Sequence, residues 1–443
     1  MKILLVSPYF PPLNAVASRR VYTFARTWAD AGHDVTVLTT TKRDDQVGME
    51  RSTAGMNIID TSLRTPAFLR RVRASAIGQV SDTTPAPHKA GLKQRLRAWT
   101  QSRGVYSSVR MPDLTDFWVN GAIDAATSAA HRPWDVVVSS SGPYTAHRVA
   151  HAIRAQDGSR TWVADFRDLW TQNHARRGVF PFTLRERMLE RQMFACVDGM
   201  TTVSEGLAQT LRQRTRAPIE VIYNGYEESA HRTLEDARVL PADGLKRLVY
   251  TGTWYPDGQQ VQPFFDAWRA LIADEPSVAR AIRLVVAGQD GRAWMAIAEQ
   301  NGLADMVEHH GELDGAAALR MQRDADALLL LDWHDASRGV LTGKIFDYLR
   351  QTAPILTIGG ETGSPIGSII EAAGRGLVLG HDVPRIADVL QTMVNAPADI
   401  HTEPVDAVIQ SYDGEHQAQR MLDMLMTLTA DAAGTDPVDP DHA

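Results

Sequence analysis

Short apolar segments alternate with helical stretches along this chain, and this alternation limits the fold more than any other feature of the sequence. Residues 2–7 (KILLVS) form a short apolar run that ends in turn residues, as a buried strand does. A helix is predicted from about Ser18, a suitable N-cap, to Ala31, where Gly32 ends it, and 34–39 form the next strand. This strand–helix–strand order with short connections favours a parallel, doubly wound sheet.

The same alternation begins again after Asn224 and Gly225. Strands are predicted before this point at 135–139, 162–166 and 199–203, and after it at 247–251, 283–288, 306–309, 327–332, 354–358 and 376–379. A chain of 443 residues is too long for one ordinary core and suits two domains. The predicted fold class is therefore α/β, with two Rossmann-like, doubly wound, parallel-sheet domains.

The domain boundaries follow from the two series of strands. We place the first domain at 1–230 and the second at 231–407, with a hinge near 224–245. A final helix within 408–430 is expected to pack back on the first domain. Residues 431–443 are rich in Asp, Pro, Ala and Gly, and we expect them to be disordered.

The composition narrows the class of protein and the compartment. Apolar residues make up 44% and charged residues 22%, a balance typical of globular proteins. The single cysteine, Cys196, excludes an internal disulfide framework and Cys-rich metal sites, and it fits a reducing cytosol. The first apolar run is too short for a signal peptide, and no stretch reaches the length of a membrane span. These features predict a cytoplasmic protein that is soluble or attached to the inner membrane surface.

Positive charge is concentrated in one segment of an otherwise acidic chain. Residues 64–110 contain ten Lys or Arg and one acid, a net charge of +9, whereas the whole chain carries −7. Two amphipathic helical stretches flank a loop at 81–91 in this segment. The segment therefore predicts an anionic partner, such as a phospholipid surface or a phosphorylated acceptor, and a solvated lid is the alternative.

Five segments, in order, resemble glycosyltransferase family four, a large group of retaining enzymes with the GT-B fold. They are the opening strand with YFPP and AGHDVTVLT, VADFRDLWTQN at 163–173, TTVSEGLAQTL at 201–211, VIYNGY at 221–226, and LVYTGTWYPDG at 248–258 followed by TGKIFDYLRQTAPIL at 342–356. The resemblance covers nearly the whole chain and is closest to a branch common in cell-surface glycan pathways. It implies two domains that face each other across a cleft, with the nucleotide sugar on the second domain and the acceptor on the first.

The segment LTGKIFDYL is the most informative part of this resemblance. Leu341, Thr342 and Gly343 precede a predicted helix start, where free backbone N–H groups suit a diphosphate and Gly343 allows close approach. Lys344 adds a positive charge in the first turn, a position that is unfavourable for a cation unless an anion is bound. Asp347 stands where the family has the second Glu of its Glu-x7-Glu motif, which implies contact with the donor ribose. A solvated Lys344 and a helix-capping Asp347 are the alternatives.

The chain departs from the family pattern at two places. Gly339 occupies the position of the first Glu, so that side chain is missing. The usual Arg and Lys after the first strand of the second domain are also missing, and Gln259 stands near the position of that Lys. Phosphate charge would then be met by Lys344 and by the backbone amides of Gly252 and Thr253.

The first domain contributes a second set of candidates. In DFRDLW, Arg167 could clamp a phosphate, and Asp165 or Asp168 could bind an acceptor hydroxyl; a buried Arg–Asp pair that fixes the loop is the alternative. Ala17 lies in the first strand–helix loop, where small residues let the donor approach. Arg20 matches an Arg of the closest branch and is assigned to the acceptor side.

Two further residues are candidates for donor contacts. Many relatives carry a His that touches the transferred sugar, and this implies such a role for His147, although a structural histidine is the common alternative. Glu312 follows a predicted strand and is expected to face the donor base. The sequence Asp324-Ala325-Asp326 spells the metal-binding DxD of another glycosyltransferase fold, but it falls where a helix leads into a strand, so we reject that reading.

The predicted function is transfer of a sugar from a nucleotide-diphosphate sugar to a glycan, lipid-linked or small-molecule acceptor, without a metal or other cofactor and without nucleic acid. The family implies retention of configuration, with the leaving phosphate as the base, because no pair of carboxylates identifies itself as nucleophile and acid/base. The alternatives are a non-catalytic GT-B protein that binds a nucleotide sugar or serves as a scaffold, and a GT-B enzyme of another reaction, such as an epimerase or a pseudo-glycosyltransferase. A dinucleotide-dependent enzyme is disfavoured because no Gly-rich fingerprint is present.

Overall fold

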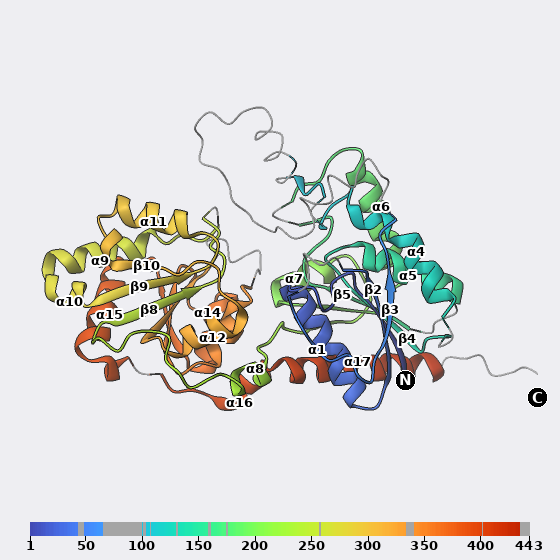
Figure 1. Ribbon diagram of the computed structural model, residues 1–443. Helices are drawn as coiled ribbons and strands as arrows, with labels where there is room; N and C mark the ends of the chain where they lie inside the picture. The colour runs from blue at the N-terminus through green and yellow to red at the C-terminus, as the bar shows by residue number, and fades with distance from the viewer. Residues whose placement is uncertain are drawn as a thin grey trace, which may run out of the picture. The chain divides into compact units, whose positions relative to one another are not determined.

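The chain forms two compact units in the computed structural model, which describes residues 1–42, 48–64, 100, 103–106, 108–129, 132–157, 161–173, 176–256, 258–333, 341–400 and 402–434 (Figure 1). Met1–Tyr223 and Glu415–Ala443 belong to the first unit, and Asn224–Gly414 form the second. The chain therefore passes between units a few residues before the predicted boundary at 230 and returns a few residues after 407. The predicted tail at 431–443 lies mostly outside the described residues.

The first unit is built on a seven-stranded parallel sheet with the strand order β3-β2-β1-β4-β5-β6-β7. Its central strands are apolar and buried on both faces, as expected of a doubly wound sheet. The strands are β1 (Lys2–Val6), β2 (Asp34–Thr40), β3 (Asn57–Thr61), β4 (Val136–Ser140), β5 (Thr161–Phe166), β6 (Gly199–Thr202) and β7 (Ile219–Val221).

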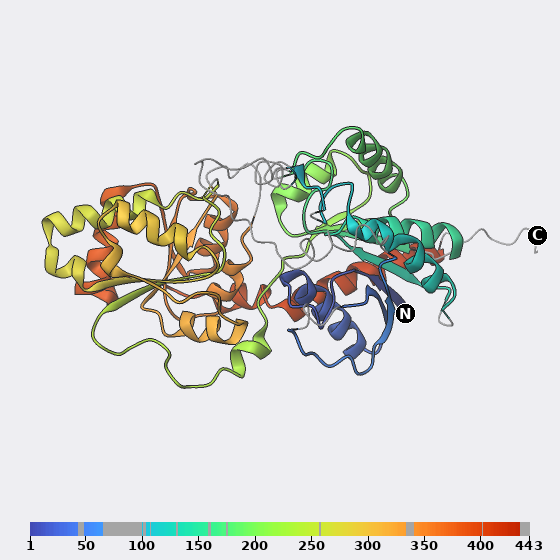
Figure 2. The ribbon, with the colours of Figure 1, turned by 45° about the horizontal axis from the view of Figure 1, so that its top comes forward.

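Helices cover both faces of this sheet. On one face, α1 (Val16–Asp30) packs beside the C-terminal helix α17 (Gly414–Gly434), where the Trp28 indole donates to the carbonyl of Ala418 at 2.9 Å (Figure 2). Met421, Leu422 and Leu425 of α17 enter the same hydrophobic core. The other face and the edges carry η3 (Leu114–Phe117), α4 (Val119–Thr127), α5 (Thr145–Asp157), α6 (Phe182–Phe194) and α7 (Glu205–Arg212).

The second unit repeats this plan with a six-stranded parallel sheet in the order β10-β9-β8-β11-β12-β13. The strands are β8 (Lys246–Thr251), β9 (Ile282–Ala287), β10 (Val307–His309), β11 (Ala327–Leu331), β12 (Ile355–Ile358) and β13 (Gly376–Gly380). The helices are α8 (Glu228–Arg232), α9 (Gln262–Asp274), α10 (Pro276–Arg280), α11 (Gly291–Gln300), η4 (Ala304–Met306), α12 (Gly315–Arg323), α13 (Lys344–Leu349), α14 (Pro365–Ala373), α15 (Val383–Asn395), η6 (Pro397–Asp399) and α16 (Asp406–Ser411). The two-domain, doubly wound α/β prediction is confirmed.

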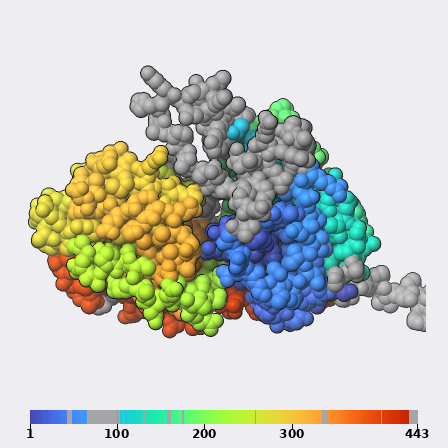
Figure 3. All heavy atoms as spheres, viewed as in Figure 1, coloured from blue at the N-terminus to red at the C-terminus, as the bar shows by residue number. Residues whose placement is uncertain are grey.

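The segment predicted as a hinge is largely part of the second unit. Residues 233–245 run along the surface of that unit and are mostly exposed (Figure 3). They are fastened to α12, since Arg320 donates to the carboxylate of Glu235 at 2.7 Å and Arg323 donates to the carbonyl of Ala237 at 3.0 Å. Tyr226 is also paired within this unit, because its amide donates to the carbonyl of Tyr412 at 3.0 Å.

The predicted N-cap of the first helix is wrong. The helix begins at Val16, and its N-cap is Ala15, which has an extended backbone and no side-chain cap. Ser18 lies inside the first turn, where its buried hydroxyl has no hydrogen-bond partner among the described residues. Because Ala17 occupies the same first turn and is 8% exposed, it faces the core rather than an open loop.

Each sheet reverses its strand order once, and these points define where a ligand can approach. In the first unit the reversal lies between β1 and β4, and in the second between β8 and β11. Ligands of open α/β sheets bind beyond the carboxyl ends of the strands at such a point. The loops after β8 and β11 are therefore the first place to look for a ligand site in the second unit.

Candidate functional site

Lys344 lies at the reversal point of the second sheet. The residue opens α13, after β11, and its Nζ donates to the hydroxyl of Tyr250 at 2.6 Å and to the carbonyl of Thr253 at 2.9 Å. Nζ also lies 3.8 Å from the centre of the Tyr250 ring, a cation–π contact. An ammonium has three N–H donors, and the described protein groups use two of them. The third is left for an incoming acceptor.

Because Lys344 is partly buried, its charge depends on the pH and on whether an anion is bound. The side chain is half-buried, and desolvation lowers its pKa to about 7, while the Asp290 carboxylate opposes this shift. In the ligand-free protein near neutral pH, the amine is therefore close to its midpoint of protonation. A bound diphosphate would favour the charged form, because an adjacent anion raises the pKa of a lysine.

Two glycines shape the backbone around this amine. Gly252 follows β8 with a φ of +93°, and a side chain there would contact Lys344. Gly288 follows β9, and a Cβ at that position would meet the carbonyl oxygen of Gly252 at 2.4 Å. The loops after β8 and β9 can pack this closely only because both positions lack a side chain.

The predicted role of the Gly252 amide is wrong. Gly252 N donates to the carbonyl of Ala287 at 2.7 Å and so continues the ladder between β8 and β9. The amide of Thr253 has no recorded partner among the described residues, so it remains a candidate for a ligand. Trp254 N is occupied as well, since it donates to Asp290 Oδ2 at 2.9 Å.

Asp290 is a residue of this site that the sequence reasoning missed. Its carboxylate holds the turn after β8 through Trp254 N and acts on the nearby Lys344 electrostatically. The sequence contains a signal for it, because Asp290 lies after β9 at the same sheet edge and directly precedes α11. We interpret Asp290 as a residue that positions the loop and partly offsets the cost of the buried amine.

Asp347 lies one turn beyond Lys344 and has a neighbour that the sequence did not predict. Its Oδ1 is 3.9 Å from Nε2 of His231 in α8, and its side chain is 35% exposed. α8 is held against α13 by Arg350, which pairs with Glu228 at 2.6 Å. The carboxylate of Asp347 is therefore partly accessible to a ligand, and the Arg350–Glu228 pair holds α13 against α8.

The other candidate site residues of the second unit lie at or near this edge of the sheet, and the protein constrains them less. Gly343 is exposed, and a Cβ there would meet nothing within 4 Å, so the protein itself does not require glycine. Leu341 and Thr342 are half-buried. Glu312 is exposed and accepts a hydrogen bond from Gln289 Nε2 at 3.0 Å. Gly339, the position of the missing Glu, lies outside the described residues.

Asp165 and Arg20 form a buried pair in the first unit rather than an acceptor surface. Arg20 donates to Asp165 at 2.8 and 3.2 Å, and the two side chains are 2% and 0% exposed. Ser140 and Thr201 donate to the same carboxylate at 2.7 and 2.8 Å, which occupies its remaining acceptor positions. The expected acceptor role of this pair is therefore not supported, and the Arg–Asp alternative is realised with Arg20 instead of Arg167.

Arg167 is held at the reversal point of the first sheet by backbone carbonyls. It donates to Ser141 O at 2.5 Å and to Gly142 O at 2.6 Å, and its guanidinium lies 5.9 Å from the centre of the Tyr9 ring. Desolvation lowers its pKa, although the guanidinium stays charged. Its neighbour Asp168 is exposed, so both residues remain candidates for ligand contacts.

His147 is enclosed within the first unit. The ring is 0% exposed, its Nδ1 lies 2.8 Å from Ser139 Oγ, and it packs against Phe166 at 4.3 Å between ring centres. Burial lowers its pKa to about 3, so the imidazole is neutral at physiological pH. Nε2 has no partner among the described residues. This geometry favours the structural alternative over contact with a sugar.

The two aspartates of the DxD sequence lie at the opposite sheet edge from Lys344, before β11 begins. Asp324 ends α12 and accepts from Val239 N at 2.6 Å, and Asp326 pairs with Lys246 at 3.1 Å. Both carboxylates thus tie loops together at the amino ends of the strands. Within the described residues, no group of three or more His, Cys, Asp or Glu side chains is arranged to hold a metal ion.

Comparisons with known proteins agree with this architecture. Residues 17–225 match the protein family described as Glycosyl transferase 4-like domain. No curated protein sequence matches the chain. None of the described helices combines the length and the apolar character needed to cross a membrane.

Solved structures with the same fold are similar over nearly the whole chain. Sucrose-phosphate synthase from Thermosynechococcus elongatus has a TM-score of 0.61 at 14% identity, with 97% of this chain and 100% of that chain covered. The E. coli trehalose-6-phosphate structure bound with UDP-2-fluoro glucose has a TM-score of 0.59 at 13% identity, with 96% and 99% covered. A putative UDP-N-acetylglucosamine 2-epimerase from Listeria monocytogenes has a TM-score of 0.54 at 14% identity, with 99% and 98% covered.

The two doubly wound units and the ligand-accessible edge of the second sheet define a protein of the GT-B class. Residues 17–225, most of the first unit, match the Glycosyl transferase 4-like domain, so the resemblance to family-four glycosyltransferases is confirmed, and the GT-B fold extends over the whole chain.

Proposed function

We propose that this protein transfers a sugar from a nucleotide-diphosphate sugar to a glycan, lipid-linked or small-molecule acceptor, with retention of configuration and without a metal. One observation carries the proposal: Lys344 is fixed beyond β8 and β11, and its ammonium form keeps one N–H that the described protein groups do not use. A diphosphate matches this arrangement, because it brings the negative charge that a half-buried amine with a lowered pKa lacks.

In the proposed chemistry, the positive charge of Lys344 lies beside the leaving group. When the bond between the sugar and the diphosphate breaks, negative charge grows on the phosphate oxygen. Lys344 would stabilise that charge from a fixed position, with the Thr253 amide as a second donor. The departing phosphate oxygen would accept the proton of the acceptor hydroxyl, which attacks the same face of the sugar and so retains its configuration.

Because Gly339 replaces a Glu of the family, a second function should be tested against sugar transfer. The missing Glu favours a protein that binds a nucleotide sugar without transferring it, and the epimerase neighbour shows that this fold is not confined to one reaction. Release of nucleoside diphosphate from intact donors, measured with and without candidate acceptors, separates these functions. Acceptor-dependent release supports transfer, whereas stable binding with no release over many hours supports the binding protein.

Replacement of Asp347 by Ala is expected to weaken donor binding by about 1–3 kcal/mol, because its carboxylate would accept hydrogen bonds from the ribose hydroxyls. Calorimetric titration of the donor measures this change. Asp388→Ala is the matched control, since Asp388 is an exposed helical aspartate in α15 of the same unit. Equal donor affinity in Asp347→Ala and wild type would show that the ribose lies elsewhere.

Chelation is expected to leave activity unchanged. Lys344 would supply the charge that a metal supplies elsewhere, and Asp324 and Asp326 are engaged at the far edge of the sheet. Transfer is measured after dialysis against EDTA and again with added Mg²⁺ or Mn²⁺. Complete loss of transfer with EDTA, restored by either ion, would contradict the metal-independent mechanism.

A further inference from the structure

The outer face of α6 exposes a line of large apolar side chains. Phe180, just before the helix, is 75% exposed, and Leu184 and Met188 are 56% and 52% exposed. Leu184 and Met188 are four residues apart and so lie on one side of the helix, and Phe180 precedes its first turn. The other large apolar side chains exposed in the described chain are scattered singly: Val16, Ile58, Val239, Val405 and Met426. The α6 line is therefore the one place where exposed apolar groups gather among the described residues.

Arginines flank this apolar line. Arg185, Arg187 and Arg191 of α6 are exposed, and no ion pair is recorded for them among the described residues. The acids of the helix face inward instead: Glu186 pairs with Arg110 at 2.7 Å and Glu190 with Arg214 at 2.6 Å, both carboxylates being at most 2% exposed. The exposed face of α6 is consequently apolar along its middle and positive at its sides.

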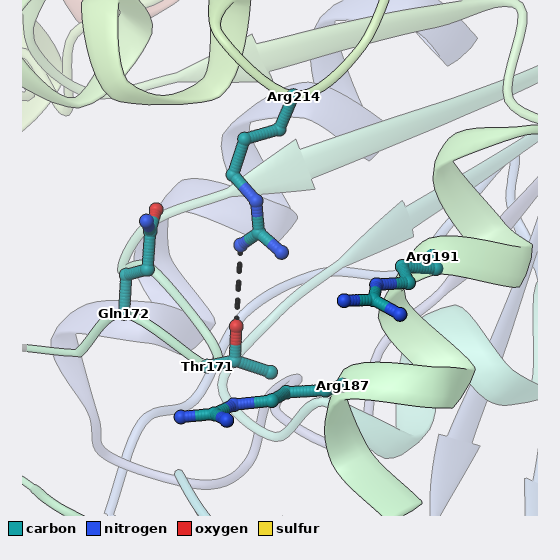
Figure 4. A pocket seen from close by; sticks show the side chains of 5 residues that line it. All are labelled: Thr171, Gln172, Arg187, Arg191 and Arg214. Carbon is teal, nitrogen blue, oxygen red and sulfur yellow. Dashed lines mark hydrogen bonds between the residues drawn. The ribbon is translucent and has the colours of Figure 1, made fainter. Parts of the chain in front are cut away.

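A pocket opens beside the same face. Figure 4 shows the guanidinium groups of Arg187, Arg191 and Arg214 around the hydroxyl of Thr171, to which Arg214 donates at 3.2 Å. Gln172 completes the lining, and the volume is about 300 Å³. Arg214 pairs with Glu190, and the Thr171 hydroxyl donates to the same carboxylate. Arg187 and Arg191 are therefore the guanidinium groups of the pocket that suit a phosphate, which accepts charge-assisted hydrogen bonds.

We propose that this α6 face, together with the arginine pocket, docks on an anionic lipid bilayer. The phosphate of a lipid headgroup would enter the pocket, and Phe180, Leu184 and Met188 would enter the boundary between headgroups and acyl chains. A helix with an apolar stripe between basic rows is the arrangement that lies in a membrane interface. The proposal is independent of the sugar-transfer function.

The positive charge of the chain's own basic segment makes that segment an unsuitable occupant of the α6 face. Residues 65–99 contain seven Lys or Arg and one Asp, so arginines on α6 would repel them. If only water covered this face, three neighbouring large apolar side chains would stay hydrated, and this has a higher free energy than burying them. An anionic bilayer satisfies the apolar groups and the arginines at once.

Vesicle co-sedimentation of the full chain tests the proposal. The probes are vesicles of phosphatidylcholine alone and of phosphatidylcholine and phosphatidylglycerol in equal parts. We expect binding to the mixed vesicles that weakens as salt is raised, and little binding to phosphatidylcholine. Equal binding to both, or no binding to mixed vesicles at low salt, would overturn the proposal.

Two sets of variants locate the surface. Arg187→Gln with Arg191→Gln should weaken binding about thirtyfold, since each basic side chain at an anionic surface contributes roughly a factor of five. Phe180→Ser, Leu184→Ser and Met188→Ser together should weaken it by about tenfold or more. The matched controls are Arg292→Gln with Arg385→Gln, and Val239→Ser with Val405→Ser, which change exposed residues of the second unit.

Each outcome decides between named alternatives. Binding that survives the arginine changes would show that another surface holds the membrane. Loss with the arginine changes but not with the serine changes would indicate electrostatic attraction without insertion, and would also overturn the proposed docking. Stabilisation by inorganic phosphate that requires Arg187 and Arg191, without vesicle binding, would identify a site for a soluble phosphate instead.

Discussion

Lys344→Met is expected to reduce sugar transfer by about a hundredfold to a thousandfold, the usual cost of losing one fixed donor to a developing negative charge. The same change should make the ligand-free protein more stable. Methionine keeps most of the side-chain packing and removes a buried amine whose pKa has been lowered to about 7. Thr253 O keeps a partner in the variant, because Tyr250 Oη donates to it at 2.7 Å.

The sign of the stability change follows from the pKa. The unfolded lysine releases its proton near 10.5 and the folded one near 7, so the folded state is penalised while the pH lies below these values. The penalty is complete below pH about 7 and disappears as the pH rises towards 10.5. Each pKa unit corresponds to about 1.4 kcal/mol of folding free energy. After allowance for solvent screening at a half-buried site, we expect Lys344→Met to raise the free energy of unfolding by about 1–3 kcal/mol.

Thermal unfolding at several pH values measures this effect. We expect the melting temperature of Lys344→Met to exceed that of wild type by about 2–4 °C for each kcal/mol, with the difference shrinking as the pH rises. Lys42→Met is the matched control: Lys42 is also half-buried, and burial lowers its pKa to about 8, but it lies in the first unit. That variant should keep normal donor affinity. A destabilised Lys344→Met with normal turnover would assign Lys344 a purely structural role.

Asp165→Ala is expected to destabilise the first unit by about 3–5 kcal/mol, because it leaves the Arg20 guanidinium buried without its carboxylate partner. The effect is large since Arg20 is only 4% exposed and cannot turn to solvent in place. Urea unfolding at neutral pH measures it, with Asp168→Ala as the control, because Asp168 is the exposed aspartate of the same segment. Unchanged stability combined with a raised KM for the acceptor would restore the acceptor role predicted from the sequence.

The part of the site that could be predicted is the part encoded in one continuous segment. Gly343, Lys344 and Asp347 lie in LTGKIFDYL, and their order alone places them at the start of a helix after a buried strand. Tyr250 and Asp290 could not be assigned in the same way. They reach Lys344 from β8 and from the loop after β9, and only the parallel order of these strands brings them together.

The same reasoning explains the errors in the first unit. Arg167 is close to Asp165 in sequence and was the natural partner to consider, but the carboxylate pairs with Arg20, 145 positions away. Strands β3 and β7 escaped prediction because both lie at sheet edges and contain half-exposed residues instead of a continuous buried apolar run. The basic segment at 64–110 lies mostly outside the described residues, so its proposed anionic partner stays a prediction.

The most direct test is donor binding measured by thermal shift with UDP, GDP, dTDP, ADP and CMP sugars, on wild type and Lys344→Met side by side. We predict that at least one donor, at about 100 times its dissociation constant, stabilises wild type by about 2.7 kcal/mol. The same donor should give little or no shift with Lys344→Met. If no nucleotide sugar stabilises the wild-type protein, or if one stabilises both proteins equally, the proposed donor site at Lys344 is wrong.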